Sequence, residues 1–466
     1  MSVAALPATE IPSATTPETA SASPRRLKTV ATLLALGLAA PLNAALALPV
    51  WLAGSLLPSR ARAEGGRTVL VSGGKMTKAL QIARAFHAAG HRVILAETRG
   101  YRLTGHRFSR AVDRFAVVPD PTDPGYAGAL VDLVREHGVD LYVPVCSPVA
   151  SHHDSLAMPA LAPHCEVVHV APDRIDAVDD KFRFSELVRG IGLRAPKSIR
   201  ITDPSQVEAH DWSGETRPFI LKSIAYDAIR RLDLTPLPRP TPEETSRFVR
   251  GLPISEGNPW VMQEYIEGTE YCTHGTLRDG RLLVHVACES SPFQINYAHL
   301  PRADIREWVE RFAAETGLTG QVSFDFIEAA DDGELYAIEC NPRTHSAITL
   351  FKDQPGLPEA YLGEREADGP LEPAPGARPT YWLYHEVFRL LRGLLPGRDP
   401  DMPGFRERLS LIARGRDAVW SWRDPLPFLM LHHVHIPSLL LRDLREGRGW
   451  TRIDFNIGKL VQEGGD

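Results

Sequence analysis

Two runs of strand-forming residues, 321–328 and 334–341, flank a short polar turn, and this pattern constrains the fold of the chain more than any other. Valine, isoleucine, phenylalanine and tyrosine are frequent in the two runs, which is typical of β-strands. The turn Asp331-Asp332-Gly333 ends in glycine, and glycine adopts the left-handed conformation that closes three-residue hairpin loops. The sequence therefore predicts an antiparallel β-hairpin that ends near Arg343.

Three oxygen-bearing side chains lie on one face of this predicted hairpin. Reflection of one strand on the other about Asp332 brings Asp325 opposite Glu339, and the two-residue period puts Asn341 on the face of Glu339. Like charges across a hairpin repel each other, and carboxylate plus amide oxygens are ligands that hard divalent cations select. Asp325, Glu339 and Asn341 are therefore predicted to bind magnesium. The alternative is a solvated acidic edge, which the apolar neighbours of each acid disfavour.

The hairpin residues Phe324-Asp325-Phe326 and Glu339-Cys340-Asn341-Pro342-Arg343 resemble the closing hairpin of the ATP-grasp superfamily. Upstream, Lys181 after Asp180 and Lys222 at the end of an apolar strand resemble the two nucleotide lysines of that superfamily. The stretch VMQEYIEGTEY resembles its adenine linker. This resemblance implies ATP contacts from the backbone of Gln263, Glu264, Tyr265 and Ile266 and from the Glu270 carboxylate on the ribose.

The implied chemistry explains why these residue types recur. A triphosphate carries about four negative charges, and lysine ammonium groups supply compensating point charges. Magnesium neutralises charge as the terminal phosphoryl group leaves; we expect two ions, for which Mn²⁺ could substitute. Arg343 is the candidate catalytic residue, because it can reach the transferred phosphoryl group or the oxygen that receives it.

One stretch departs from the superfamily pattern. Residues 223–240, where a glycine-rich flap usually covers the phosphates, contain no glycine, so backbone amides are not expected to cradle phosphate there. Side-chain donors from Arg230 and Arg231 could replace them. Surface charges without a ligand are the equal alternative for these two arginines.

Composition narrows the class of protein further. The chain has 466 residues and a net charge of −6 without a long basic run, which disfavours nucleic acid as a partner. Its five cysteines show no CxxC spacing, so neither a zinc site nor a disulfide framework is indicated. Length and composition fit a cytoplasmic enzyme of about three domains.

The order of segments predicts an α/β fold in four parts. Residues 1–66 form a disordered tail and an apolar segment, and residues 67–175 alternate short strands with helices, as a Rossmann-like pre-ATP-grasp domain does. Residues 176–363 carry the ATP-grasp pattern of an α+β domain. Residues 364–466 read as a Pro- and Gly-rich linker followed by a helical C-terminal extension.

The apolar segment 29–59 has no charged residue and is broken by Pro41, Asn43 and Pro49. About 20 apolar residues span a bilayer, so the segment could span once or enter and return at the Pro41 break. Basic flanks on both sides favour a helical hairpin with both ends in the cytoplasm, anchored to the inner face of the cell membrane. A cleaved signal peptide and a helix packed on the catalytic body are the alternatives.

A closer resemblance covers nearly the whole chain beyond Arg26. The stretches SGGKMTKALQIARAFHAAGHRVIL, DKFRFSEL, YDAIRRLDLTPLP, ECNPRTHSAITLF and DFNIGKL are similar to the mycosporine-glycine synthase family. That resemblance implies a ligase that joins glycine to the cyclic enolone 4-deoxygadusol through a phosphorylated enol, giving mycosporine-glycine, ADP and phosphate. Arg230, Arg231, His345 and Ser346 are then candidates for the ring hydroxyls or the amino-acid carboxylate.

Two rival functions remain open at this stage. An ATP-grasp ligase that joins an ordinary carboxylate to an amine would carry the same ATP residues. A nucleotide-binding protein without turnover is the second rival, and the intact set Lys181, Lys222, Asp325, Glu339 and Asn341 argues against it. The preferred amine is not fixed by the sequence, and a homodimer is left open.

Overall fold

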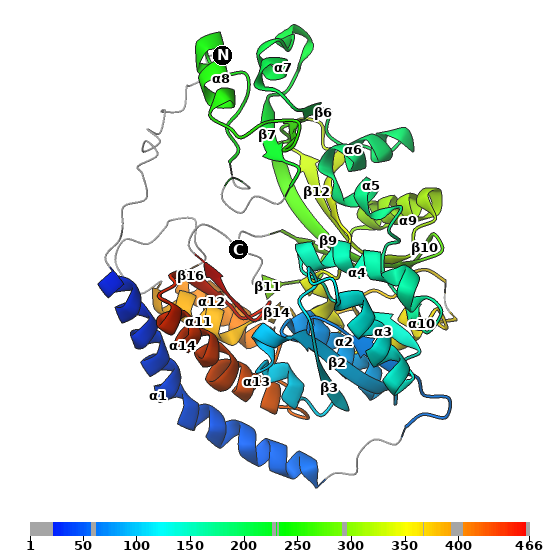
Figure 1. Cartoon of the computed structure of the whole chain (residues 1–466), viewed down its shortest axis with the longest axis vertical. Helices are drawn as coiled ribbons and strands as arrows, with labels where there is room; N and C mark the ends of the chain where they lie inside the picture. The colour runs from blue at the N-terminus through cyan, green and yellow to red at the C-terminus, as the bar shows by residue number, and fades with distance from the viewer. Residues whose placement is uncertain are drawn as a thin grey trace.

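The computed structural model describes residues 22–56, 62–225, 230, 233–290, 296–366, 368–392 and 404–462. Figure 1 shows a parallel sheet with its helices at the lower right, antiparallel sheets above it, and a C-terminal group of helices beside the parallel sheet. Arg231 and the other residues outside these ranges, which include residues 226–229 and 232 of the glycine-free stretch, are not described.

The first sheet is parallel throughout and has the strand order β3-β2-β1-β4-β5. Its strands are short and mostly buried because helices cover them, which is why they read as apolar runs in the sequence. This arrangement confirms the predicted Rossmann-like fold. The strands are β1 (Thr68–Val71), β2 (Arg92–Thr98), β3 (Arg114–Val118), β4 (Leu141–Val143) and β5 (Glu166–Val167), and the helices are α2 (Thr77–Ala88), α3 (Tyr126–His137) and α4 (Pro148–Leu161).

Two antiparallel sheets follow, as an ATP-grasp fold requires. The smaller sheet has the order β6-β8-β7, and its core surrounds Trp260 and Phe219. The larger has the order β10-β9-β12-β13. The strands are β6 (Ser198–Ile201), β7 (Phe219–Ser223), β8 (Trp260–Glu264), β9 (Gly268–Arg278), β10 (Arg281–Glu289), β12 (Gly320–Ala329) and β13 (Leu335–Asn341); the flanking helices are α5 (Ile175–Asp179), α6 (Lys181–Gly190), α7 (Pro204–Glu208), α8 (Pro242–Arg250) and α9 (Ala303–Thr316).

An aromatic cluster fixes the larger sheet against α6 and α9. Phe184 of α6 stacks on Phe324 with ring centroids 6.0 Å apart, and Trp308 of α9 meets Phe326 edge-on at 4.9 Å. Phe312 completes the cluster. Because Phe324 and Phe326 point into this core, the intervening Asp325 must face the opposite side of β12. The aromatic core therefore sets the direction of the carboxylate.

The C-terminal extension is less purely helical than its sequence suggests. The helix α10 (Leu357–Leu362) precedes it, and its own helical elements are α11 (Leu383–Arg392), α12 (Phe405–Arg414), α13 (Leu426–Met430), the π-helical turn η5 (Leu431–His435) and α14 (Ile436–Glu446). It also contains short strands: residues 380–381 pair on one side with residues 296–297 and on the other with residues 416–417. The strands are β11 (Asn296–Tyr297), β14 (Thr380–Tyr381), β15 (Arg416–Asp417), β16 (Trp450–Asp454) and β17 (Lys459–Gln462).

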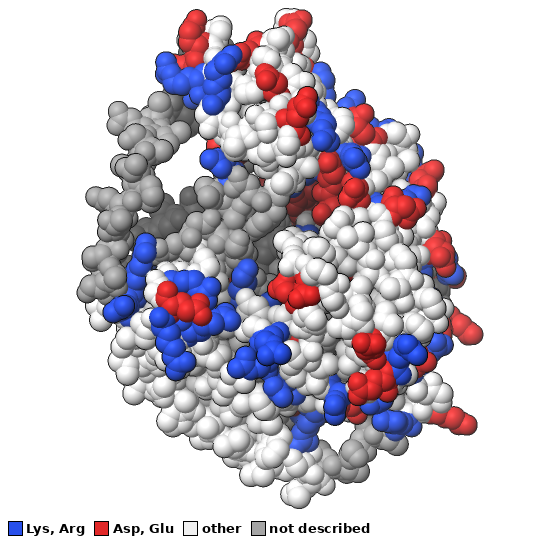
Figure 2. Space-filling model, in the orientation of Figure 1, with Lys and Arg blue, Asp and Glu red and all other residues white. Residues whose placement is uncertain are grey.

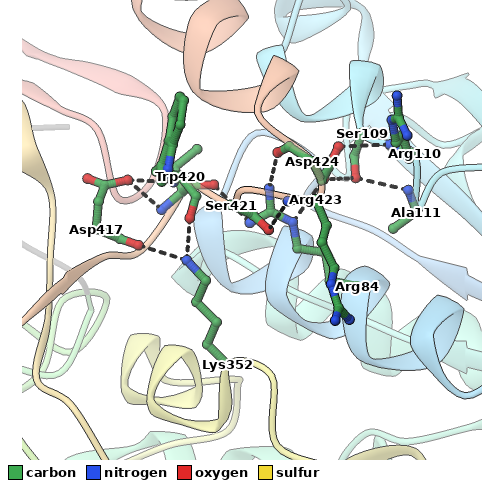
Figure 3. Close-up of polar contacts among 11 residues, drawn as sticks. Arg84, Ser109, Arg110, Ala111, Lys352, Asp417, Trp420, Ser421, Arg423 and Asp424 are labelled. Carbon is green, nitrogen blue, oxygen red and sulfur yellow. Dashed lines mark hydrogen bonds and ion pairs between the residues drawn. The ribbon is translucent and has the colours of Figure 1, made fainter. Parts of the chain in front are cut away.

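A buried polar hub joins the extension to the Rossmann-like sheet (Figure 3). Asp424 accepts hydrogen bonds from Arg84 Nε of α2 at 2.9 Å, from Ser109 Oγ at 2.5 Å and from the Arg110 amide at 3.0 Å. Lys352 donates to the carbonyl oxygens of Asp417, at 3.0 Å, and of Trp420. Because an unpaired buried charge is costly, these contacts fix the extension on the N-terminal sheet.

The apolar N-terminal segment forms one helix, α1 (Ala22–Ser55), which continues through Pro41 and Pro49. The predicted break at residues 41–43 is therefore wrong, and α1 packs lengthwise on the body of the protein, as the packed-helix alternative stated. Hydrogen bonds hold its beginning, middle and end. They join Lys28 and Thr29 to Trp450, Asn43 to Tyr384 and His433, and the carbonyl of Trp51 to Arg110.

The opposite face of α1 is apolar and exposed. Leu34, Leu38, Leu42 and Leu46 follow one another at four-residue spacing, and each is more than half exposed. Figure 2 shows a largely uncharged surface along α1. Within the described residues, α1 is the single helix long and apolar enough to cross a membrane, with a mean hydropathy of 1.9 over its best window.

Buried histidines predict how stability depends on pH. Burial lowers the pKa of His106 to about 4 and the pKa of His385, His432 and His435 to about 3, whereas the unfolded chain titrates near 6.5. Between these values the unfolded state binds more protons, so the free energy of unfolding falls as the pH falls. We expect the melting temperature, followed by circular dichroism, to drop steeply as the pH falls from about 6.5 towards 4.

A single replacement checks the assignment. His435→Gln removes one of these titrating groups, so the variant should lose less melting temperature on acidification than the parent does. Identical pH profiles for the two proteins would contradict a role for His435 in acid lability.

Candidate active site on the β12–β13 hairpin

The hairpin register brings the two acids together. Asp325 of β12 pairs directly with Glu339 of β13, and a bulge follows because Phe326 pairs with Ala337. Gly333 has φ +70° in the connecting turn, the left-handed conformation expected of it. The predicted pairing of Asp325 with Glu339 is confirmed. Asn341 lies on the same face, with its Nδ2 3.2 Å from Glu339 Oε1 and 3.3 Å from Asp325 Oδ2.

Burial and neighbouring charges shift the pKa values of the two acids in opposite directions. Burial and the neighbouring Glu339 raise the pKa of Asp325 well above its usual value. Burial alone would raise the pKa of Glu339 too, but Lys181 and a hydrogen bond from Asp325 outweigh it and hold that pKa below its usual value. The first proton that the pair takes up is therefore held on Asp325. Two half-buried carboxyl groups and an amide oxygen fit a hard divalent cation, which would compete with that proton.

No larger acidic or histidine cluster competes for a metal. Among the residues that the structure describes, no group of three or more His, Cys, Asp or Glu side chains is placed to hold one. The pair with the adjoining amide is therefore the metal-site candidate. All five cysteines are free and buried.

Both predicted nucleotide lysines face this pair. Lys181 is the first residue of α6, whose N-cap Asp180 accepts from the amides of Phe182 and Arg183, and Lys181 Nζ lies 3.4 Å from Glu339 Oε2. Lys222 lies on β7, and burial lowers its pKa while Glu339 opposes that shift. The structure thus brings two cations from separate elements to the carboxylates.

The predicted adenine linker is only partly available. Gln263 and Glu264 end β8, and Tyr265 and Ile266 lead into β9. The amide of Glu264 donates to Lys197 O and that of Tyr265 to Pro218 O, both at 2.8 Å, so these two N–H groups are used within the fold. The contacts of the remaining backbone groups of residues 263–266 with a base stay a prediction. The exposed Glu270 follows on β9, close enough to influence the pKa of Lys222 and Asp325.

The hairpin exit carries the candidate substrate residues. Arg343 donates to Asn341 Oδ1 at 2.5 Å. His345 caps the turn η4 (Ser346–Phe351), and its ring meets Tyr297 edge-on at 5.3 Å. Ser346 is buried and accepts a hydrogen bond from Asn456 Nδ2 at 2.8 Å. These residues follow the metal-site candidate directly along the chain.

The two arginines of the glycine-free stretch cannot be placed together. Arg230 is described, and its carbonyl oxygen accepts the amide of Asp233 at 2.9 Å, whereas Arg231 lies outside the described residues. Their assignment as substrate residues stays a prediction.

Sequence reasoning missed two residues that reach the same place from distant parts of the chain. Lys78 of α2 donates to Thr344 O at 2.5 Å. Asn456, in the turn between β16 and β17, binds Ser346, and its carbonyl accepts the amide of Thr77 at 2.8 Å. Both residues lie in stretches that carried the family resemblance, KMTKAL and DFNIGKL. No local pattern pairs them with the hairpin, because 266 and 110 residues separate the contacts in sequence.

The Rossmann-like sheet has a cavity of its own at the carboxyl ends of its strands. This cavity of about 230 Å³ is lined by Ser72, Gly73, Lys75 and Tyr101, among others. Gly73 has φ +65°, and a Cβ there would lie 1.9 Å from Val145 O, so only glycine fits. Such an edge is where open α/β sheets bind ligands.

Comparison with known proteins finds relatives among carbamoyl phosphate synthase large chains. No family model matches it. The chain is 24% identical over 298 residues to the C-terminal section of the carbamoyl phosphate synthase large chain from Methanopyrus kandleri, covering 57% of this chain and 54% of that protein. It is 25% identical over 278 residues to the large chain of that synthase from Vibrio cholerae, covering 54% and 25%. The match thus spans about half or less of these relatives.

Solved structures agree on the fold. The chain superposes on N5-carboxyaminoimidazole synthetase from Staphylococcus aureus, solved with ADP, with a TM-score of 0.50 and 14% identity over 69% of this chain and 82% of that one. The fold, with a Rossmann-like sheet followed by paired antiparallel sheets, is that of the ATP-grasp superfamily, as predicted. The relatives support the superfamily and leave the narrower family open.

The buried acid pair predicts a stability effect without any ligand. A carboxyl with a raised pKa in the folded state destabilises that state at every pH above its unfolded pKa of about 3.9. Asp325→Asn removes this penalty, so we expect a higher melting temperature at pH 7. Asp424→Asn is the control, because Asp424 pairs with Arg84, and its melting temperature should fall. A lower melting temperature for Asp325→Asn would contradict the buried repulsion.

Proposed function

We propose that the protein is an ADP-forming ATP-grasp ligase that joins glycine to 4-deoxygadusol and releases mycosporine-glycine, ADP and phosphate. The observation that carries the ligase class is the convergence of Lys181, Lys222 and Arg343 on the paired Asp325 and Glu339. The choice of acceptor and amine rests on the resemblance to the mycosporine-glycine synthase family. The division of the chain at residues 66, 175 and 363 belongs to the same proposal.

Separate groups of residues bind the nucleotide, the metal and the receiving oxygen. Lys181 and Lys222 bind the phosphates of ATP, and the segment 263–266 with Glu270 binds the nucleoside. Asp325, Glu339 and Asn341 hold magnesium, which when bound neutralises phosphate charge during transfer. Arg343, held by Asn341 at 2.5 Å, stabilises the oxygen that receives the phosphoryl group.

The proposed reaction has two steps. The enolate oxygen of 4-deoxygadusol attacks the terminal phosphorus of ATP, and the bond to the bridging oxygen breaks to release ADP. The amine of glycine then adds to the carbon that carries the phosphate, loses a proton, and phosphate departs. Phosphorylation turns a poor leaving oxygen into a good one. The site must exclude water during this step to prevent hydrolysis.

A carboxylate acceptor is the second candidate. The observation in its favour is that the matched relatives are carbamoyl phosphate synthases, whose named product is a mixed anhydride of a carbamate and phosphate. Incubation with ATP, magnesium, glycine and 4-deoxygadusol separates the two. One ADP per mycosporine-glycine supports the enolone. The second candidate replaces the enolone if ADP is released with a carboxylate and never with the enolone. In that case hydroxylamine should trap the acyl phosphate as a hydroxamate.

The metal-site assignment predicts a kinetic loss. Glu339→Ala and Asp325→Ala each remove a carboxylate that acts in the transition state more than in folding, so turnover should be abolished while the circular dichroism spectrum is retained. Glu328→Ala is the matched control, because Glu328 lies on the same strand and binds Arg302 and Tyr271 instead. Parental rates in either metal-site variant would contradict the assignment.

We further propose a cytoplasmic protein that contacts the membrane through α1 in the plane of the lipid surface. Three observations support this orientation. The inner face of α1 is bonded at its beginning, middle and end, its outer face is a leucine stripe, and residues 22–63 contain no acid while Arg26 and Arg62 flank the stripe. An apolar stripe with basic ends suits an anionic leaflet.

The leucine stripe predicts vesicle binding. The full chain should float with vesicles that contain phosphatidylglycerol. Replacement of Leu34, Leu38, Leu42 and Leu46 by serine should abolish flotation, since each buried methylene contributes about 0.8 kcal/mol. Replacement of the exposed Leu103 and Leu156 is the control. If the parent is soluble and monomeric without detergent and does not float with the vesicles, α1 does not bind membrane.

A further inference from the structure

Lys78 is a buried lysine in a position that structure alone does not favour. It is the second residue of α2 and is 6% exposed. A cation in the first turn opposes the helix dipole, and burial of an ammonium group is costly unless it is paired. Its Nζ has one acceptor, Thr344 O at 2.5 Å, and it makes no ion pair with any described residue. Such a cation requires a function.

The charged groups around Lys78 are cations. Burial, and after it the charge of Arg343, lower the pKa of Lys78 to about 7, while Cys146 acts in the opposite direction. The neighbouring rings of His274 and His345 are neutral at pH 7, because burial lowers their pKa well below the usual value. Two basic side chains, Lys78 and Arg343, therefore lie beside the hairpin exit, and Lys78 has no acidic ion-pair partner among the described residues.

Hydrogen bonds from segments far apart in the sequence fix the position of Lys78. Thr344, whose carbonyl it binds, donates its Oγ1 to Gln321 Oε1 at 2.6 Å, and Gln321 donates to Pro144 O at 2.9 Å. On the other side, Thr77 receives a hydrogen bond from Trp382 Nε1 at 3.0 Å. A cation held this firmly is preorganised for a ligand.

We infer that Lys78 binds the oxyanion of the acceptor, the oxygen that takes the phosphoryl group, together with Arg343. The inference rests on the proposed ligase function and holds for an enolate or a carboxylate acceptor. Thr344 adjoins Arg343 along the chain and follows the metal-site candidate Asn341 by three residues, so the ammonium group of Lys78 lies next to the segment proposed to hold magnesium and the receiving oxygen. Lys78 would complete this anion site from the Rossmann-like sheet.

The test compares Lys78→Met with the parent in steady-state turnover of 4-deoxygadusol. Methionine keeps the length and removes the charge, so the fold should persist with an unchanged or higher melting temperature. The KM for the acceptor should rise on the order of 10–100-fold, as expected for a lost charged hydrogen bond, while the KM for ATP stays unchanged. Lys78→Arg, which keeps the charge, should recover part of the acceptor affinity.

The matched control is Lys352→Met. Lys352 is also a buried lysine bound to backbone carbonyls, with a pKa lowered by burial to about 8, but Asp417 and Asp353 lie near it. Its replacement should lower the melting temperature and leave the KM for the acceptor unchanged. An unchanged acceptor KM in Lys78→Met, or an equal rise in both KM values, overturns the inference.

The experiment distinguishes a wrong choice of acceptor from a wrong role for Lys78. If the parent turns over a carboxylate and not 4-deoxygadusol, the enolone is wrong, and the same KM comparison with that carboxylate decides the role of Lys78. If neither is turned over, inorganic phosphate is the probe. Phosphate should raise the melting temperature of the parent with magnesium and ADP more than that of Lys78→Met. Equal shifts overturn the inference.

Discussion

The site depends on the electrostatic repulsion between the neighbouring carboxyl groups of Asp325 and Glu339. The hairpin register pairs the two acids directly, and the aromatic cluster around Phe324 and Phe326 fixes which face of β12 is directed at the core. Relief must therefore come from cations, and the fold supplies them from separate elements. Lys181 comes from the start of α6 and Lys222 from β7.

The second constraint is the junction between α2, the hairpin exit and the C-terminal turn. Asn456 links the first residue of α2 to Ser346, so three distant segments meet within hydrogen-bond distance. Gly458, with φ +60°, makes the approach possible, because a Cβ there would lie 2.4 Å from Lys75 O. The extension is thus a structural part of the site, and the Asp424 hub holds it in place.

The sequence predicted what short-range rules control. The hairpin pairing follows from a two-residue period and one turn glycine, and the Rossmann-like sheet follows from alternating apolar runs and helices. It did not predict the two-residue strands β14 and β15, which are too short to show periodicity. It also placed a break at Pro41, whereas bonds from Asn43 to Tyr384 and His433 hold the helix just beyond that proline. Tertiary contacts of this kind leave no local signal.

Lys78 illustrates why sites that span domains escape sequence reasoning. Within α2 its neighbours Ala79, Leu80 and Ile82 are buried, and a lysine among them reads as a solvated residue at a helix start. Its burial results from the hairpin exit that covers it, which is a contact over 266 residues. Since His274 and His345 are neutral there, Lys78 and Arg343 are the basic groups that the described part of the chain brings to the exit. The capacity of this place for an anion therefore depends on a residue that only the assembled fold reveals.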